Sequence, residues 1–191
     1  AVDARRVRAR GTQPAVVSGD LLRLVVADAA DGIATLVLAD DLGVGAGVLA
    51  PDGSLAEFDI RTPNSQPRAI GLGPDGNMWF GMFAAGKIGR VTPDGTITEF
   101  AIPTPNSGPR ALAAGSDGNI WFSEYRASKI GRITPDGTIT AFALARPNSG
   151  PGEMTTGAGG NLWFVELAGG ADGQDTDGNR VARMTLMGQV T

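Results

Sequence analysis

Three observations predict an all-β fold built from a repeated unit. Trp-Phe pairs begin at residues 79, 121 and 163, Pro-Asp-Gly triplets at 51, 93 and 135, and Pro-Asn-Ser triplets at 63, 105 and 147. Each motif recurs at a spacing of 42 residues. A fixed period of this size is typical of repeat architectures. The shared period indicates one structural unit that the chain copies.

Four short strands fit each copy. In the copy that starts near residue 109, we expect strands at 110–114, 119–125, 129–134 and 138–144, each bounded by Gly, Pro or Asp clusters. Thr134-Pro-Asp-Gly is typical of a hairpin turn, because Pro presets φ and Gly accepts a positive φ. Helical periodicity is absent. Four antiparallel strands in about 40 residues make up a β-propeller blade.

The repeat divides the chain into a basic N-terminal arm and about four blades. The arm covers residues 1–12, and the repeats cover 13–191, with blades at about 13–60, 67–102, 109–144 and 151–191. The first blade is degenerate, with Thr35-Leu-Val-Leu in place of Trp-Phe, and the last is incomplete. The chain could form a compact four-bladed ring, part of a larger ring, or half of an assembly that another chain completes. We favour part of a larger ring.

The Trp-Phe pairs are expected to hold neighbouring blades together. Adjacent residues of a strand point to opposite faces of the sheet. Trp121 and Phe122 should therefore pack on the two blades that flank their own. This interpretation assigns the aromatic pairs to the core and not to a ligand site.

Composition excludes several functional classes. The chain of 191 residues has no Cys and no His, which removes thiolate catalysis and the commonest general base. The net charge of −4 argues against nucleic acid, and no apolar run is long enough for a membrane span. Residues 1–10 contain no apolar segment typical of a signal peptide. The compartment, cytoplasmic or secreted, is left open.

The repeat resembles the virginiamycin B lyase family of streptogramin lyases, which are akin to NHL-type propellers. The resemblance is carried by Gly-Pro-Arg-Ala-Leu, Asp-Gly-Asn-Ile-Trp-Phe-Ser-Glu and Ser-Lys-Ile-Gly-Arg-Ile-Thr-Pro-Asp-Gly, and covers about 51–191 well. It implies seven blades in one chain. It also implies a Mg²⁺-dependent lyase that linearises cyclic depsipeptide antibiotics, an antibiotic-resistance activity, by elimination across the ester bond.

The catalytic residues that the resemblance implies do not carry over. The family's histidines follow the Pro that opens the innermost strand, where this chain has Arg68, Arg110 and Gly152. The family's essential Glu falls where this chain has Phe83, Tyr125 and Leu167. Arg is always protonated and cannot act as a base. Glu153 and Glu166 are the remaining weak candidates, so the sequence predicts a chain without catalytic residues.

Ligand binding without catalysis is therefore the predicted function. Pro-Arg at 67–68 and 109–110 is expected to ring the channel mouth, and we predict a ligand-binding site formed by Arg68, Arg110, Glu124 and Tyr125. Its partner would be a small molecule, a peptide or another chain. A streptogramin lyase that draws its histidines from elsewhere, and a purely structural repeat, stay open as alternatives.

An acidic insertion in the last blade suggests a metal site. It carries Asp172, Asp175 and Asp177, with Gly178 after the third. Oxygen ligands two residues apart, followed by Gly, resemble half of a calcium-binding loop. We predict weak Ca²⁺ binding there. Mg²⁺ is implied only by the family resemblance.

Overall fold

The predicted all-β fold is confirmed. The computed structural model describes residues 27–28, 34–40, 43–49, 55–167 and 180–190, with side chains described from residue 58 onward. Within these residues the strands form antiparallel sheets, and the one helical element is the 3₁₀ turn η1 (Ala158–Gly160). No helix in the described ranges is long and apolar enough to cross a membrane.

The strands of each sheet follow one another in the chain and in space. The first sheet contains β1 (Ala27–Asp28), β2 (Ala34–Asp40), β3 (Gly43–Leu49) and β4 (Leu55–Asp59). The second contains β5 (Pro67–Leu72), β6 (Met78–Met82), β7 (Lys87–Val91) and β8 (Ile97–Ala101). The third contains β9 (Pro109–Ala114), β10 (Ile120–Glu124), β11 (Lys129–Ile133) and β12 (Ile139–Ala143). The last contains β13 (Pro151–Thr156), β14 (Leu162–Glu166) and β15 (Arg180–Met184).

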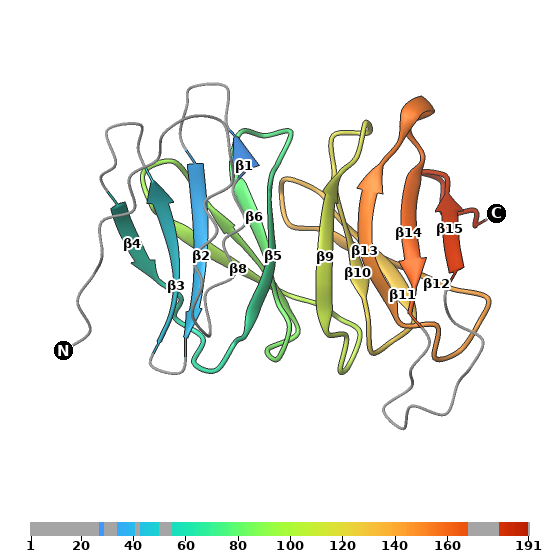
Figure 1. The fold of residues 1–191 in the computed structure, drawn as a ribbon, viewed down its shortest axis with the longest axis horizontal. Helices are drawn as coiled ribbons and strands as arrows, with labels where there is room; N and C mark the ends of the chain where they lie inside the picture. Colours follow the sequence, from blue (N-terminus) through green and yellow to red (C-terminus); the bar gives the residue numbers. More distant parts are fainter. Residues whose placement is uncertain (1–26, 29–33, 41–42, 50–54, 168–179, 191) are drawn as a thin grey trace.

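These sheets stand side by side in sequence order. The first strands of successive sheets are neighbours, since β5 contacts β9 and β9 contacts β13. Figure 1 shows the first sheet at one end of the array and the last sheet at the other. In the third copy, each of the four expected strands ends within one residue of its predicted bounds. This is the stacked-sheet architecture predicted for propeller blades.

The predicted hairpin turns are confirmed as well. In the turn from Thr134 to Thr138, the Gly137 N–H donates to the Thr134 carbonyl at 2.8 Å, and Gly137 has a φ of +96°. The Thr134 hydroxyl also hydrogen bonds to the Asp136 carboxylate. A residue with a side chain rarely adopts this backbone conformation, which explains why Gly occupies the position. The same turn recurs around Gly95 one repeat earlier.

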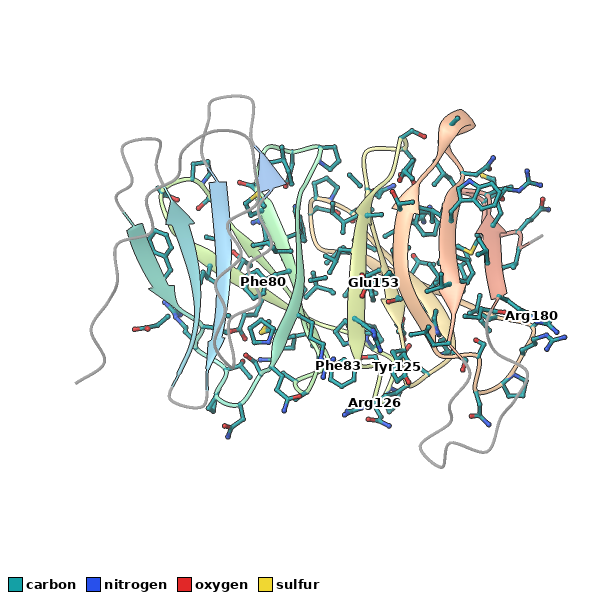
Figure 2. All side chains as sticks on the ribbon, viewed as in Figure 1. Phe80, Phe83, Tyr125, Arg126, Glu153 and Arg180 are labelled. Atoms are coloured by element: carbon teal, nitrogen blue, oxygen red, sulfur yellow. The ribbon has the colours of Figure 1, made fainter. Side chains whose placement is uncertain are left out.

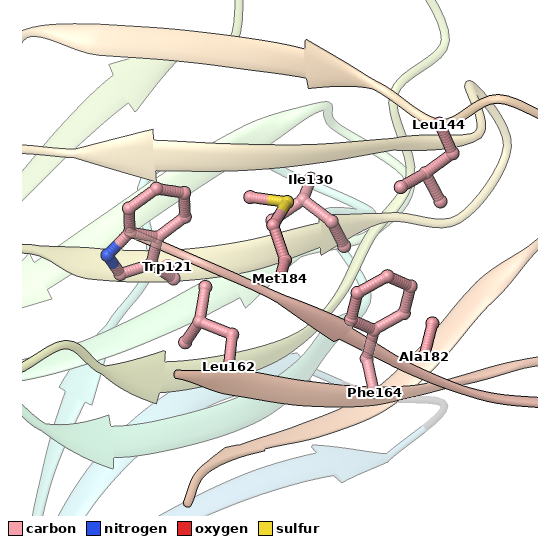
Figure 3. Packing of buried hydrophobic residues seen from close by; sticks show 7 residues of the cluster. All are labelled: Trp121, Ile130, Leu144, Leu162, Phe164, Ala182 and Met184. Carbon is pink, nitrogen blue, oxygen red and sulfur yellow. The ribbon is translucent and has the colours of Figure 1, made fainter. Parts of the chain in front are cut away.

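The Trp-Phe pairs pack between sheets as predicted. Trp79 of the second sheet shares a buried cluster with Phe122 of the third, and Trp121 of the third shares one with Phe164 of the last. Figure 3 shows the second of these clusters, with Trp121 and Ile130 facing Leu162, Phe164 and Met184. The two members of each pair thus serve opposite faces of their sheet. Burying large rings in this way is the main stabilising contribution between neighbouring sheets.

A hydrogen bond that the sequence analysis missed fixes each buried indole. The Trp121 Nε1–H donates to Asp117 at 3.2 Å, and the Trp79 Nε1–H donates to Asp75 at 3.0 Å. Burial disfavours the charged carboxylate of Asp117, but hydrogen bonds from Asn119 and Trp121 outweigh it, so its pKa lies below the ordinary value. The Asp-Gly-Asn turn therefore also satisfies the buried Trp N–H of the following strand.

Trp163 departs from the expectation of a buried core. Its side chain is 40% exposed, although it occupies the same repeat position as Trp79 and Trp121. The position of the carboxylate partner is taken by Gly159. The physical reason for the exposure is that no other sheet of the described residues packs on this face, where the Arg183 guanidinium carbon lies 5.9 Å from the indole centroid.

Replacing Gly131 by Ala tests the contact between the Phe ring and the facing strand. Phe122 lies opposite Gly131 in the register, and a Cβ on Gly131 would overlap the Phe122 ring. We expect Gly131→Ala to lower the free energy of unfolding by about 1–3 kcal/mol, because overpacking forces the ring or the strand to move. Urea denaturation followed by circular dichroism measures this loss.

Gly71→Ala is the matched control. Gly71 is also a strand glycine, and an added Cβ there meets no heavy atom within 4 Å. The control should keep its stability within about 0.5 kcal/mol. Equal losses in the two variants would contradict the proposed role of the Phe–Gly contact.

Candidate functional site

The candidate site lies at the end of the sheets where β5, β9 and β13 begin. Antiparallel pairing places Pro67 opposite Met82 and Pro109 opposite Glu124. The starts of the inner strands therefore lie beside the β6–β7 and β10–β11 connections. The Pro-Asn-Ser turns lead into the same strand starts, with Asn64, Asn106 and Asn148 all at positive φ. The second and third sheets thus each bring three short segments to one end of the molecule.

Arginine side chains pack on two neighbouring aromatic rings at this end. The guanidinium carbon of Arg68 lies 4.1 Å from the Phe83 ring centroid, and that of Arg126 lies 4.4 Å from the same centroid. The Phe83 and Tyr125 rings are 6.3 Å apart and tilted by 43°. The Arg110 guanidinium carbon lies 5.1 Å from the Tyr125 centroid.

The carboxylate of Glu153 lies at the end of this series of contacts. The Arg110 Nε atom lies 3.9 Å from the Glu153 Oε1 atom, a long ion pair whose carboxylate side chain is 67% exposed. We call the six residues the arginine–aromatic row: Arg68, Phe83, Arg110, Tyr125, Arg126 and Glu153. Figure 2 shows Phe83, Tyr125 and Arg126 grouped at one end of the inner strands.

Electrostatically, the row is basic in an acidic chain. It holds three guanidinium groups and one carboxylate, whereas the whole chain has a net charge of −4. Arg68, Arg126 and Glu153 are exposed, while Arg110 and Tyr125 are half-buried. Cation–π contacts of this kind contribute about 0.5–2 kcal/mol each and keep the guanidinium groups in fixed orientations. The row offers guanidinium N–H donors for anionic or carbonyl oxygens and the half-buried Tyr125 ring for stacking, whereas the Phe83 ring is buried.

The structure brings three of the four residues predicted for ligand binding into the row. Arg68, Arg110 and Tyr125 are members, and Glu153, a weak catalytic candidate, meets Arg110. The sequence analysis did not predict Phe83 or Arg126 as ligand-binding residues. A signal was available, because Phe83 and Tyr125 stand at the same position of the 42-residue repeat. Arg126 also donates a hydrogen bond to the Asn106 side chain at 3.2 Å, which joins two loops of this end.

Glu124, the fourth predicted ligand-binding residue, is fully buried. Neither of its carboxylate oxygens has a hydrogen-bond partner among the described residues. Burial raises the pKa of Glu124 above its ordinary value, and the nearby Thr104 hydroxyl and Lys129 charge oppose this only in part. Glu124 therefore lies beneath the surface of the row. Glu166, one repeat later, is also buried.

The preceding repeat holds its carboxylate differently. Glu99 forms an ion pair with Lys87 at 2.8 Å and accepts a hydrogen bond from the Thr62 hydroxyl at 2.6 Å. Burial opposes the charged form of Glu99, but these partners outweigh it and the pKa is lowered. In the third sheet the equivalent position is Ala141, and the carboxylate belongs to Glu124 instead. Lys129 occupies the repeat position of Lys87, whereas the acid lies on β10 instead of the fourth strand of the sheet.

Comparison with known proteins identifies the family. The model of the virginiamycin B lyase family matches residues 26–191. The chain belongs to the virginiamycin B lyase family. A search of curated proteins found no match.

Solved structures of streptogramin lyases resemble this family member closely. A streptogramin B lyase structure has 29% sequence identity and a TM-score of 0.77, and the match covers 90% of this chain and 53% of that one. A catalytically inactive His-to-Ala variant of virginiamycin B lyase from Staphylococcus aureus, solved with quinupristin, has 33% identity and a TM-score of 0.78. That match covers 91% of this chain and 55% of the other. The chain spans about half the length of these structures.

The described residues show no cluster of acidic side chains for the Mg²⁺ that the family resemblance implies. Magnesium in proteins is held by oxygen ligands, usually carboxylates. Among the described residues, no three His, Cys, Asp or Glu side chains come together. The row itself offers one carboxylate among three guanidinium groups. Asp172, Asp175 and Asp177 of the predicted calcium loop lie outside the described residues, as does the basic arm at 1–12. Both stay predictions.

Glu124→Gln tests the burial of an acid that its neighbours compensate only in part. A group whose pKa is raised in the folded state contributes stability below its unfolded pKa of about 4.3, and this contribution is lost as pH rises through the folded pKa. Gln cannot ionise. We expect the free energy of unfolding of Glu124→Gln to exceed that of the unmodified chain by a margin that grows from pH 4 to pH 8. Urea denaturation at several pH values measures the margin.

Glu99→Gln is the control, for which we expect the opposite dependence of stability on pH. The pKa of Glu99 is lowered, so its contribution is present above the unfolded pKa and is lost as pH falls through the folded pKa. This variant should be less stable than the unmodified chain at pH 7, and the difference should shrink toward acid pH. The same pH trend in both variants would show that Glu124 is not held as described.

Proposed function

We propose that the arginine–aromatic row binds a cyclic depsipeptide of the streptogramin B type, and that this chain does not cleave it. The observation that carries the proposal is the series of contacts that runs from Arg68 through the Phe83 and Tyr125 rings to Arg110. The half-buried Tyr125 ring can stack on a flat group of a ligand, while guanidinium N–H groups donate to carbonyl oxygens. A virginiamycin B lyase was solved with quinupristin, and this chain belongs to the same family, which supports this class of ligand.

The residue types in the row support binding over catalysis. Elimination across an ester bond needs a base that removes a proton. The positions that resemble the family's histidine sites hold Arg68, Arg110 and Gly152, and the chain has no His. In the quinupristin structure, the lyase with one His replaced by Ala is described as inactive. Glu166 is buried, and Glu153 lies beside the Arg110 guanidinium.

A Mg²⁺-dependent C–O lyase is the second candidate. Its support is the family match over residues 26–191 and the likeness to two streptogramin lyase structures. Under this alternative, histidines and metal ligands would have to come from outside this chain. The two candidates differ in one observable, which is whether the lactone of a bound streptogramin opens.

Arg110→Ala tests the binding role of the row. This change removes the cation–π contact to Tyr125 and the ion pair with Glu153. We expect quinupristin to bind at least about tenfold more weakly, because a lost hydrogen bond from a charged guanidinium to a ligand oxygen costs about 1.5–3 kcal/mol. Isothermal titration calorimetry gives the dissociation constants.

Arg132→Ala is the matched control, since Arg132 also stacks on aromatic rings, Trp121 and Phe142, but outside the row. Equal affinities for the two variants would exclude the row as the binding site.

The second test is for catalysis. The chain incubated with quinupristin and Mg²⁺ should leave the lactone intact, because no described residue of the row combines the position and the chemistry of a base. Mass spectrometry and chromatography distinguish the cyclic from the linear form. Ring opening above the rate without protein, abolished by Glu153→Gln, would establish the lyase alternative instead.

A further inference from the structure

The charged residues in the connections of the second and third sheets are divided between the two ends of the molecule. The four turns at the end opposite the row join β5 to β6, β7 to β8, β9 to β10 and β11 to β12. Each of these turns carries one Asp and no Lys or Arg: Asp75, Asp94, Asp117 and Asp136. The turns at this end are therefore acidic at neutral pH.

The loops at the row's end have the opposite charge. The β4–β5, β6–β7, β8–β9 and β10–β11 connections contain Arg61 and Arg126 and no Asp or Glu. Arg68 and Arg110 stand at the second position of β5 and β9, which begin at this end. Three of these four arginines belong to the row. An acidic chain that places arginines together at one end directs anionic ligands to that end.

The third sheet holds Arg110 at a β-bulge. The register between β9 and β10 shifts there, so that Arg110 and Ala111 together stand opposite Ser123. Ser123 is fully buried, and its hydroxyl accepts a hydrogen bond from the Ala111 N–H at 3.0 Å. A bulge next to a site re-aims the side chain that it carries. The fold therefore positions Arg110 before any ligand binds.

Arg110 and Arg126 retain hydrogen-bond donors, since each guanidinium has five N–H groups. Among the described residues, Arg126 gives one of them to the Asn106 side chain, and the Arg110 Nε atom lies 3.9 Å from Glu153, beyond hydrogen-bond distance. Arg126 is exposed, and 27% of the Arg110 side chain is exposed. The remaining donors can bind an oxyanion through short, charge-assisted hydrogen bonds.

No carboxylate in the described part of the chain forms a close ion pair with these two arginines. Glu99 is paired with Lys87 at 2.8 Å, and Glu124 is fully buried. Glu153 is largely exposed and makes only the long contact with Arg110. Both arginines belong to the third sheet, whose inner strand has β5 on one side and β13 on the other. Their environment is therefore built by sheets that the structure describes.

We propose that Arg110 and Arg126 form an oxyanion subsite within the row, and that the row prefers the linear carboxylate form of a streptogramin B depsipeptide to the cyclic ester. The half-buried Tyr125 ring, which contacts the Arg110 guanidinium, offers a surface for a flat group of the same ligand. The subsite rests on the two arginines, whereas the class of depsipeptide rests on the proposed function.

Opening of the lactone by elimination creates such a carboxylate. A base removes a proton from the carbon next to the alkyl carbon of the ester. The bond between that alkyl carbon and the ester oxygen breaks, and its electron pair stays on the oxygen. The product is one linear chain with an alkene at one end and a carboxylate at the other. A guanidinium binds a carboxylate more strongly than a neutral carbonyl oxygen, so the row binds most tightly what a lyase releases.

The first experiment compares three forms of quinupristin by isothermal titration calorimetry: the cyclic ester, the linear acid that an active streptogramin lyase produces, and the methyl ester of that acid. We expect the linear acid to bind at least about tenfold more tightly than either ester, because only the acid presents a carboxylate. The methyl ester is the matched control, since it has the same open skeleton without the charge. Raising the salt concentration should weaken the binding of the acid much more than that of the methyl ester.

The second experiment removes one arginine. Arg126→Gln should lower the affinity for the linear acid at least about tenfold and change that for the methyl ester much less. Arg126→Lys keeps the charge without the planar fork and should recover part of the loss. Arg61→Gln is the matched control, because Arg61 is an exposed arginine of the same end outside the row. It should keep the preference for the acid. Damage to the fold weakens both ligands alike, so the ratio of the two affinities separates a binding role from a structural one.

The outcomes separate this inference from the proposed function. Binding of the cyclic ester with no preference for the linear acid would overturn the oxyanion subsite and leave the proposed function standing. Binding of the linear acid alone would support the subsite and overturn the proposed function. Binding of none of the three forms would overturn both. A preference for the acid that Arg126→Gln and Arg61→Gln reduce equally would also overturn the subsite, because the charge of the whole end would then account for it.

Discussion

Packing of aromatic side chains between stacked sheets is the interaction on which the rest of this structure depends. The second strand of each of the last three sheets carries Trp and Phe side by side, and the alternation of a strand sends them to opposite faces. Trp121 and Phe122 are both fully buried, one against the last sheet and one against the second. The facing Gly131 allows the Phe ring to lie flat on the next strand. Each 42-residue repeat therefore supplies the side chains of one interface between neighbouring sheets.

The same packing positions the candidate site. Stacking brings the starts of β5, β9 and β13 side by side, so residues one repeat apart become neighbours. Phe83 and Tyr125 are 42 residues apart in the sequence, and their rings lie 6.3 Å apart. Arg68, Arg110 and Arg126 then fill the spaces around these rings. A site assembled from equivalent repeat positions can change chemistry by single substitutions, because the sheets beneath it carry the stability.

Residues of one repeat position can also have different environments. Lys87 and Lys129 are one repeat apart, yet Lys87 forms an ion pair with Glu99, whereas the acid of the next repeat, Glu124, stands at another repeat position and is buried without a hydrogen-bond partner among the described residues. Trp79 and Trp121 are buried, while Trp163 is exposed and has Gly159 where the others have an Asp partner. The environment of each residue depends on which sheet follows its own. Sequence periodicity identifies equivalent positions, but it does not predict their burial or protonation.

The sequence alone determined the period, the strands, the hairpin turns and the aromatic core, and it excluded histidine chemistry. These features follow from residues close together in the chain: Pro and Gly define turns, and alternation defines the two faces of a strand. The sequence also indicated Arg68, Arg110 and Tyr125. Only the tertiary structure decided that Phe83 and Arg126 join them, that Glu124 lies beneath the surface, and that Trp163 is exposed. Those outcomes depend on contacts between different sheets, made by side chains some 42 residues apart, which no local pattern encodes.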